Sequence, residues 1–187
     1  DVNEGVYGFS VSGNAIRYGL SAIKSLGRPT IDALVEERKA NGSFKNLRDF
    51  IERMNKDANK RTIENFIKAG AFDCFDGNRR QEMLVYPQIL DDVLRNEKNS
   101  LSGQMSLFDF VSDEEKASYE IKMPDVAEYS KKELLAFEKE VLGFYVSGHP
   151  MEAYFDLLAK KTTAKTSDFL LNEETGEVVV KDQSTVT

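Results

Sequence analysis

The first 45 residues combine a short extended pattern with two helical ones. Residues 6–11 alternate apolar and polar side chains, which predicts a short strand that turns at residues 12–14. From Ile16 onward the apolar spacing becomes helical, and after an interruption Pro29 suits the first turn of a second helix. That helix is expected to end at Gly42, because glycine commonly terminates helices.

Three more helices are predicted over the next fifty residues. Asn46 and Asn59 are each followed by apolar residues at helical spacing, and both are favourable N-caps. The helix after Asn59 is expected to stop at Gly70, and a longer helix is expected over about 79–95. Pro87 lies inside this long helix and is expected to kink or split it. Its buried side is predicted to hold Met83, Leu84, Leu90 and Val93.

The pattern changes after residue 95. Residues 96–103 are polar, and a short apolar island at 104–108 follows without helical context, which predicts a flexible linker. A helix then begins at Ser130, where Glu133 completes a capping box, and it is expected to end at Gly143. A shorter helix over about 151–160 exposes apolar side chains to some partner surface, and residues 177–180 form the best late strand.

Composition places the chain among globular proteins of a reducing compartment. Of the 187 residues 41% are hydrophobic and 30% are charged, which argues against a disordered chain. No apolar run approaches the roughly 20 residues of a membrane-spanning helix, and there is no signal peptide. The single cysteine, Cys74, excludes an internal disulfide, which suits the cytoplasm. Because the chain begins with Asp1, it is expected to be cut from a longer protein.

The net charge of −7 argues against nucleic-acid binding, but its distribution reverses that interpretation. Residues 17–80 contain 14 Lys and Arg against 9 Asp and Glu. A basic first half on an acidic protein fits a phosphate-binding surface. It also fits an ordinary solvated surface, and charge alone favours that alternative.

A turn between two predicted helices carries the first functional signal. Residues 23–31 read Ile-Lys-Ser-Leu-Gly-Arg-Pro-Thr-Ile, a small turn with basic residues on both sides. Its leucine anchors the turn, and its glycine lets the backbone approach a phosphate that the next helix N-terminus binds. Such a device contacts DNA backbone rather than bases, and the alternative is an ordinary helix–helix corner. The candidate residues are Lys24, Ser25, Leu26, Gly27, Arg28 and Thr30.

A second corner repeats these features about 45 residues later. One helix opens after residue 59, residues 69–73 turn, and the next helix opens at residues 77–80. Arginines at a helix N-terminus oppose the helix dipole, and a bound phosphate between them would remove that conflict. The candidates are Lys60, Arg61, Gly70, Asn78, Arg79 and Arg80, with solvated arginines as the alternative. Two such corners resemble the tandem helix-hairpin-helix arrangement that grips duplex DNA.

Three blocks of sequence resemble successive blocks of the bacterial DNA polymerase III alpha subunit family, DnaE type. They are residues 16–24, 59–73 and 142–150, in the order and at the spacing of that family. The resemblance covers residues 1–160 and implies a stretch that follows the fingers domain and precedes an OB-fold. Ser25 departs from the family, which usually has glycine there, and Pro29 also differs from the common forms. Both departures bear on how closely the first hairpin approaches DNA.

The resemblance implies a mainly α fold, with a tandem helix-hairpin-helix bundle, a linker, a helical connection and the truncated start of an OB-fold. The expected domains are a connecting strand from the fingers region over 1–15, the DNA-binding module over 16–95, a flexible linker over 96–125, the helical connection over 126–160 and the OB-fold start over 161–187.

The apolar island in the linker is a second sharp signal. Gln104, Met105, Ser106, Leu107 and Phe108 resemble the Gln-x-x-Leu-Phe peptide by which polymerases bind the bacterial β sliding clamp. Leu107 and Phe108 form an apolar pair suited to a pocket, and the Gln104 amide fixes the register. The alternative is that this pair packs on the core of its own chain.

No catalytic or metal-binding set is predicted. His149, the single histidine, has neither a second histidine nor a nearby cysteine with which to hold zinc. The acidic runs at 91–92 and 113–115 lie on no predicted strand and lack a basic clamp, so a two-metal site is rejected. The resemblance places the catalytic carboxylates and their Mg²⁺ in the palm, upstream of this chain. No cofactor is expected here.

The resemblance implies a non-catalytic piece of a DNA-directed DNA polymerase, acting at the replication fork in the bacterial cytoplasm. It would hold the new duplex behind the active site and bind the clamp, with the rest of the polymerase and holoenzyme as partners and no membrane. A helix-hairpin-helix glycosylase or nuclease is one rival, and it would need a catalytic Lys or Asp beside the hairpin. A free-standing adaptor between DNA and clamp is the other, disfavoured by the missing initiator Met and the unfinished last strand.

Overall fold

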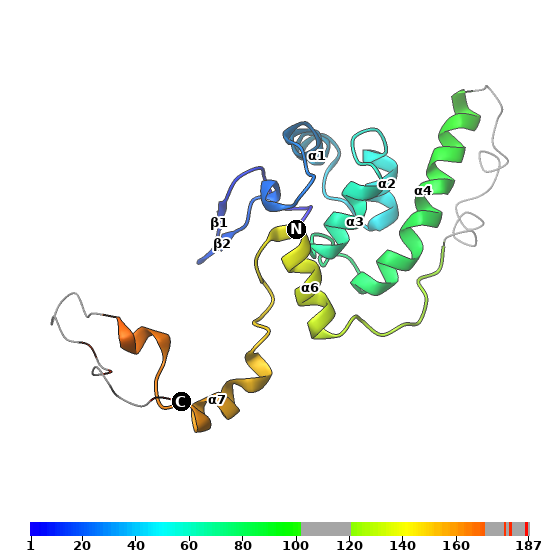
Figure 1. Cartoon of the computed structure of the whole chain (residues 1–187). Coiled ribbons are helices and arrows are strands. Elements are labelled where there is room, and N and C mark those ends of the chain that lie inside the picture. Colours follow the sequence, from blue (N-terminus) through cyan, green and yellow to red (C-terminus); the bar gives the residue numbers. More distant parts are fainter. Residues whose placement is uncertain (102–120, 171–177, 179, 181–185, 187) are drawn as a thin grey trace. The chain divides into compact units, whose positions relative to one another are not determined.

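A computed structural model describes residues 1–101, 121–170, 178, 180 and 186, which divide into two units, Asp1–Val146 and Ser147–Thr187. The first unit is mainly helical, as predicted (Figure 1). Its elements in chain order are β1 (Ser10–Ser12), β2 (Ala15–Arg17), the short 3-10 helix η1 (Leu20–Ala22), α1 (Arg28–Asn41), α2 (Leu47–Met54), α3 (Lys60–Lys68), α4 (Arg79–Leu101) and α6 (Lys131–Leu142). α4 packs against α2 and α3, and α3 also packs against α6.

The chain opens with a β-hairpin rather than with a single strand. β1 and β2 pair antiparallel, and Gly13 makes the turn at φ +59. The turn at 12–14 is therefore confirmed, but the strand predicted over 6–11 lies closer to the turn than expected. The helix predicted from Ile16 is wrong, because Ile16 pairs with Val11 and only the three-residue η1 follows. The backbone groups that a helix would use make cross-strand hydrogen bonds instead. The domain boundary predicted between residues 15 and 16 falls inside β2.

The predicted helix ends are confirmed at most other positions. The side chain of Asn46 accepts a hydrogen bond from the Asp49 N–H, and Asn59 likewise accepts from the Thr62 N–H. Gly42 follows α1 at φ +80. α6 has the expected capping box of Ser130 and Glu133, and it ends at Gly143 in the left-handed conformation.

α4 differs from its prediction in three respects. It runs without interruption through Pro87, whereas a kink or a split was expected. Its buried side chains are Val85, Tyr86, Ile89 and Val93, while Leu84 is 57% exposed. The helix also continues to Leu101, so the linker does not begin at residue 96. Contacts of Glu97 with Asn55 and Lys56 in the loop before α3 extend the packing of α4 beyond the predicted end.

Four phenylalanines form the centre of the core between α2, α3 and the loops beside them. The rings of Phe44 and Phe66 each pack edge-on against Phe50, with centroids 5.0 and 5.5 Å away. Phe72 lies 4.8 Å from Phe50 and 5.5 Å from Phe66. All four rings are buried, so truncating one of them to alanine is expected to cost about 3–5 kcal/mol of stability.

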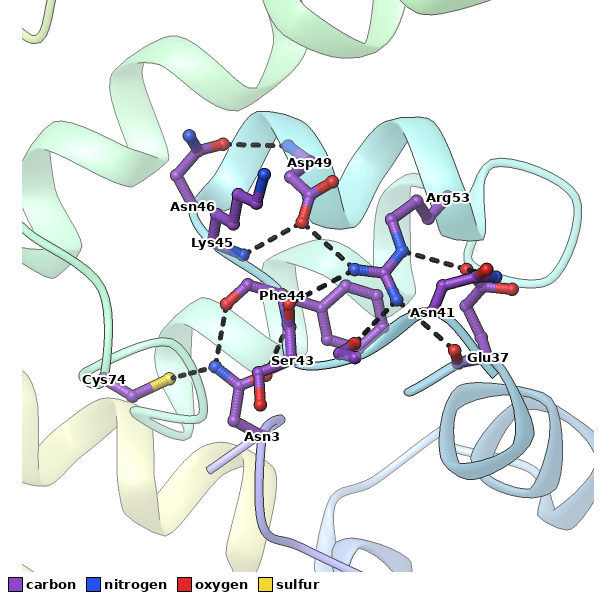
Figure 2. Close-up of polar contacts among 11 residues, drawn as sticks. Asn3, Glu37, Asn41, Ser43, Phe44, Lys45, Asn46, Asp49, Arg53 and Cys74 are labelled. Carbon is purple, nitrogen blue, oxygen red and sulfur yellow. Dashed lines mark hydrogen bonds and ion pairs between the residues drawn. The ribbon is translucent and has the colours of Figure 1, made fainter. Parts of the chain in front are cut away.

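The loop between α1 and α2 is closed by Arg53 (Figure 2). Its guanidinium donates to the backbone carbonyls of Glu37 and Gly42, at 3.3 and 2.8 Å, and to the carboxylates of Glu37 and Asp49, at 2.9 and 3.2 Å. It also lies 4.2 Å above the ring of Phe44. From the other side the Asn3 amide bonds both backbone groups of Phe44, so the N-terminal segment, α1 and α2 meet at this loop.

The second unit contains η3 (Glu152–Tyr154), α7 (Phe155–Lys161) and η4 (Thr166–Phe169). The short helix predicted over 151–160 is confirmed, and its apolar side chains are exposed. Val178 and Val180 are in no strand, while residues 177 and 179 lie outside the described part of the chain, so the OB-fold start stays a prediction. Among the described helices of both units, none is long and apolar enough to cross a membrane.

Candidate nucleic-acid interface

The first predicted hairpin has a left-handed turn at Ser25. Ser25 has φ +64, a conformation that glycine adopts freely and that other residues adopt at a cost. Ile23 before it is buried, and the Leu26 N–H donates to the Ile23 carbonyl at 3.2 Å. Leu26 packs against the core, as predicted for the residue that anchors the turn. The element before the turn is only the three-residue η1, so this hairpin has one full helix, α1.

The backbone of this turn is fixed from two sides. The Lys24 N–H donates to the Val141 carbonyl in α6 at 2.8 Å. The Lys24 carbonyl accepts a 2.7 Å hydrogen bond from the side-chain amide of Asn65 in α3. The side chain of Lys24 remains exposed. Two helices distant in sequence therefore set the position of the turn, and neither contact was predicted.

Asn65 holds the turn of the candidate site, and the sequence did not point to it. It is 8% exposed and lies between the buried Ile63 and Phe66 on α3. A polar residue within the apolar stripe of a helix needs a hydrogen-bond partner when it is buried, and this position in the stripe is what could have identified Asn65 from the sequence. The sequence does not show that the partner is the carbonyl of Lys24.

The N-terminus of α1 has free hydrogen-bond donors. Gly27 is its N-cap and provides no side chain, and the first turn contains no acidic residue. Within the described residues, the N–H groups of Arg28 and Thr30 have no hydrogen-bond partner, and Pro29 has no N–H. Side chains cap α2, α3, α4 and α6, so α1 differs from the other long helices of this unit. Free N–H groups at a helix N-terminus favour an anion.

Four exposed cations flank the starts of α1 and α3. Lys24 and Arg28 lie on either side of the hairpin turn at Ser25, and Lys60 and Arg61 open α3. The hydroxyl of Thr30 donates to the Asp57 carbonyl at 3.1 Å, which holds the first turn of α1 beside the loop that leads into α3. Arg28 is partly neutralised by Asp32, at 3.5 Å, and it lies 4.8 Å above the ring of Tyr7. We refer to Lys24, Arg28, Lys60, Arg61 and the α1 N-terminus as the basic face.

Arg79 does not belong to this face, because it lies inside the protein. It is 8% exposed, and its guanidinium makes two hydrogen bonds to Asp73, at 2.8 and 2.6 Å. It also donates to the Lys68 carbonyl and lies 3.7 Å from Glu138 of α6. Burial by itself would lower the pKa of Arg79, but the hydrogen bonds to Asp73 and the nearby negative charges of Asp73, Glu138 and Glu128 together outweigh it and hold that pKa above its ordinary value. Arg79 joins the α3–α4 corner to α6 and has no free donor edge for DNA.

The other residues of this corner are also engaged within the chain. The Arg79 and Arg80 N–H groups donate to the Glu128 carboxylate, at 3.0 and 3.2 Å, so a carboxylate occupies the position predicted for a phosphate. The side chain of Asn78 donates to the Val126 carbonyl. Gly70 faces Arg79 rather than DNA, since a Cβ there would lie 2.0 Å from the Arg79 guanidinium. Of these four candidates only the Arg80 side chain is exposed.

The same corner contains a buried acid, Glu82. Its side chain is 3% exposed, and its Oε2 has no hydrogen-bond partner. Burial is the main cause and the negative charge of Asp73 the second; together they raise the pKa of Glu82 to about 8, and the positive charge of Arg79 offsets this rise only in part. The carboxyl is therefore mostly protonated at neutral pH. Among the described residues no group of three or more His, Cys, Asp or Glu side chains could hold a metal ion.

The predicted clamp peptide, Gln104 to Phe108, lies outside the described residues. His149, interpreted as a structural turn residue, accepts a hydrogen bond from the Met151 N–H through Nδ1 and stacks on Phe155. It lies in the second unit.

Comparison with known proteins agrees with the helical architecture. A family model described as the helix-hairpin-helix motif matches residues 1–82. Proteins named DNA polymerase III subunit alpha are similar over most of the chain: 39% identical over 155 residues in Borreliella burgdorferi, 37% over 163 in Chlamydia pneumoniae and 39% over 160 in Mycobacterium leprae. These alignments cover 82–86% of the chain but only 13–14% of each relative. The chain thus spans about one seventh of the length of these proteins.

Proposed function

Since this chain belongs to the DNA polymerase III alpha subunit family, we propose that its basic face binds the phosphate backbone of duplex DNA. The binding would be non-catalytic and would hold the duplex on the polymerase. Polymerase activity is a property named for the relatives, and this chain corresponds to a small part of them.

The observation that carries the proposal is the free N-terminus of α1. The Arg28 and Thr30 N–H groups donate no hydrogen bond to any described residue, whereas side chains cap the other long helices of the unit. A phosphate oxygen supplies the missing acceptor and the charge that the helix dipole favours. Lys24 and Arg28 flank this position, and the Thr30–Asp57 bond joins the first turn of α1 to the loop that leads into α3, which Lys60 and Arg61 open.

This geometry predicts binding that is independent of sequence and weakened by salt. Phosphate contacts carry no base information, and each neutralised phosphate adds about −0.9 to the slope of log affinity against log salt. The α3–α4 corner contributes less than the sequence suggested, because Arg79, Asn78 and Gly70 are engaged within the chain. We therefore assign the second contact to the start of α3.

A fluorescence anisotropy titration with labelled duplexes of two unrelated sequences tests this proposal. Lys24→Glu with Arg28→Glu should weaken both duplexes about tenfold or more and should flatten the salt slope. Lys39→Glu with Lys45→Glu is the charge-matched control, because both lysines are exposed and lie outside the basic face. Equal losses in the two double variants would show only a general charge effect and would refute the assignment.

A repair enzyme built on helix-hairpin-helix units is the rival. It would need a reactive Lys or Asp in a pocket beside the hairpin, and Asp32, the nearest carboxylate on α1, is exposed and paired with Arg28. DNA cleavage by the purified chain, abolished by a substitution of one of its own acids or lysines, would favour the rival.

We propose further that Gln104 to Phe108 docks on the β sliding clamp. The support is the sequence pattern, since these residues lie outside the described structure. An apolar pair preceded by polar, Gly- and Ser-containing sequence suits a pocket on a partner, with Leu107 and Phe108 as the anchors.

A further inference from the structure

The β-hairpin presents its apolar side to solvent. In the register of β1 and β2, Val11 lies opposite Ile16, and Phe9 and Tyr18 continue the same face one step further. These four side chains are 83, 72, 68 and 48% exposed, in that order. The centroid of the Tyr18 ring lies 4.9 Å from that of Phe9 and 4.7 Å from that of Phe144, so the aromatic part of this surface continues as far as Phe144. We call Phe9, Val11, Ile16 and Tyr18 the hairpin face.

The opposite side of the hairpin is polar and is bound to the chain itself. Arg17 pairs there with Asp1 and Glu4 and donates to the hydroxyl of Ser12. The hairpin therefore uses its polar side for internal contacts and exposes its apolar side, which is the reverse of the usual arrangement of a half-buried sheet. An exposed apolar surface of this kind marks an interaction site.

The chemistry of the hairpin face favours a protein surface over nucleic acid. Its two most exposed residues, Val11 and Ile16, are aliphatic, and its two rings, Phe9 and Tyr18, pack edge-on against each other. The cation of the hairpin, Arg17, lies on the other side and is paired with two carboxylates. A partner that matches this face is an apolar, uncharged protein surface.

We infer that the hairpin face docks on another part of the same, longer polymerase polypeptide. The relatives are about six times as long as this chain, so most of such a polypeptide lies outside the structure. A separate protein or a second copy would need about 20–30 residues on each side for a stable complex, far more than this face offers. A tethered segment has a high effective concentration, and a small apolar face is then sufficient. This inference uses the family membership and is independent of DNA binding.

The double substitution Val11→Asp with Ile16→Asp tests the inference in two polypeptides. The first is the 187-residue chain, whose first unit has its own core. The second is the full-length polymerase subunit that contains this segment. The melting temperature of the short chain should stay unchanged, because Val11 and Ile16 are exposed and none of the described residues covers them, whereas that of the full-length subunit should fall. A large fall in the short chain, or no fall in either, would overturn the inference.

Photo-crosslinking identifies the occupant. p-Benzoylphenylalanine at position 11 of the full-length subunit should crosslink to peptides outside these 187 residues, and the same group at the exposed Lys39 position should not. Crosslinks to added duplex, or between two copies of the subunit, would overturn the inference in favour of nucleic acid or self-association. The aspartate variant should bind duplex with unchanged affinity, which separates this result from a failure of the basic face.

Discussion

The side-chain amide of Asn65 donates a 2.7 Å hydrogen bond to the backbone carbonyl of Lys24. The Lys24 N–H is bound in turn by the Val141 carbonyl at 2.8 Å. Through these two bonds α3 and α6 fix the peptide that precedes the left-handed Ser25 and the free N-terminus of α1. Because α6 supports the turn, the support of the proposed basic face extends beyond residue 95, where the sequence predicted the end of the module.

Removing the Asn65 amide should therefore weaken DNA binding as well as folding. Asn65→Ala leaves the Lys24 carbonyl, whose hydrogen bond is part-buried, without its donor, which costs about 1–3 kcal/mol of stability. With the protein still folded at 20 °C, duplex affinity should fall several-fold, because the turn is no longer held in position. Anisotropy titration and thermal melting of the same samples measure both effects. Asn55→Ala, which removes a longer surface bond to Glu97, is the control. If the Asn65→Ala variant is destabilised but binds duplex with unchanged affinity, the role of Asn65 is confined to folding.

Ser25 tests the cost of the left-handed turn. A residue with a side chain at φ +64 costs about 1–2 kcal/mol, and glycine avoids this cost at the expense of about 0.5–1 kcal/mol of chain entropy. Ser25→Gly should thus be neutral or slightly stabilising. Ser25→Val should destabilise the chain, because β-branching conflicts with positive φ. Urea denaturation should separate the two variants by about 1–2 kcal/mol, and equal stabilities would show that the turn relaxes at no cost.

Glu82 should make stability fall as pH rises. Its pKa is raised from 4.5 to about 8 in the folded chain, so the folded state binds more protons than the unfolded state between these values. The free energy of unfolding should decrease across pH 5–8 by up to about 1.4 kcal/mol per pH unit and then level off. Glu82→Gln should remove this decrease and stabilise the chain at pH 8.

Denaturant titrations of the wild type and of Glu82→Gln at pH 5, 6.5 and 8 measure this effect. Glu36→Gln is the control, since Glu36 is exposed on α1. Parallel pH profiles for the wild type and Glu82→Gln would mean that Glu82 is ionised in the folded chain, which would refute its raised pKa.

The clamp proposal separates binding from folding. Leu107→Ala with Phe108→Ala should abolish binding to purified β clamp, while melting temperature, helicity and duplex affinity stay nearly unchanged. The affinity of the unmodified chain should be about micromolar, or about −8 kcal/mol, because a short peptide buries little area and ordering it costs about 1–2 kcal/mol per residue. Surface plasmon resonance on immobilised clamp measures it. A double variant that melts much lower would place the pair in the core, and a stable variant that still binds would place the clamp site elsewhere.

Several elements were predictable because their causes are local. The caps Asn46, Asn59 and Ser130 bond backbone groups within three residues, and Gly42 and Gly143 end helices by adopting positive φ. The sequence also pointed to Lys24 and Arg28 by their place on either side of the first turn, and to Lys60 and Arg61 by their place at a helix start, and all four are exposed. Two predictions failed because their causes are not local. Ile16 was expected in a helix but pairs with Val11 in a hairpin, and packing on α2 and α3 sets the buried side of α4.

The sequence by itself determined the capped starts of α2, α3 and α6, the glycine stops of α1 and α6, and the first turn with its basic residues. Only the tertiary structure decided which of the basic residues face solvent. Arg79 and Arg80 are neighbours in sequence, yet one is buried against Asp73 and Glu138 while the other is exposed. Their difference depends on α6 and on Glu128, which lie about 50 residues further along the chain. Backbone preference acts over a few residues, whereas the free energy of an ion pair depends on burial and on partners that folding brings together.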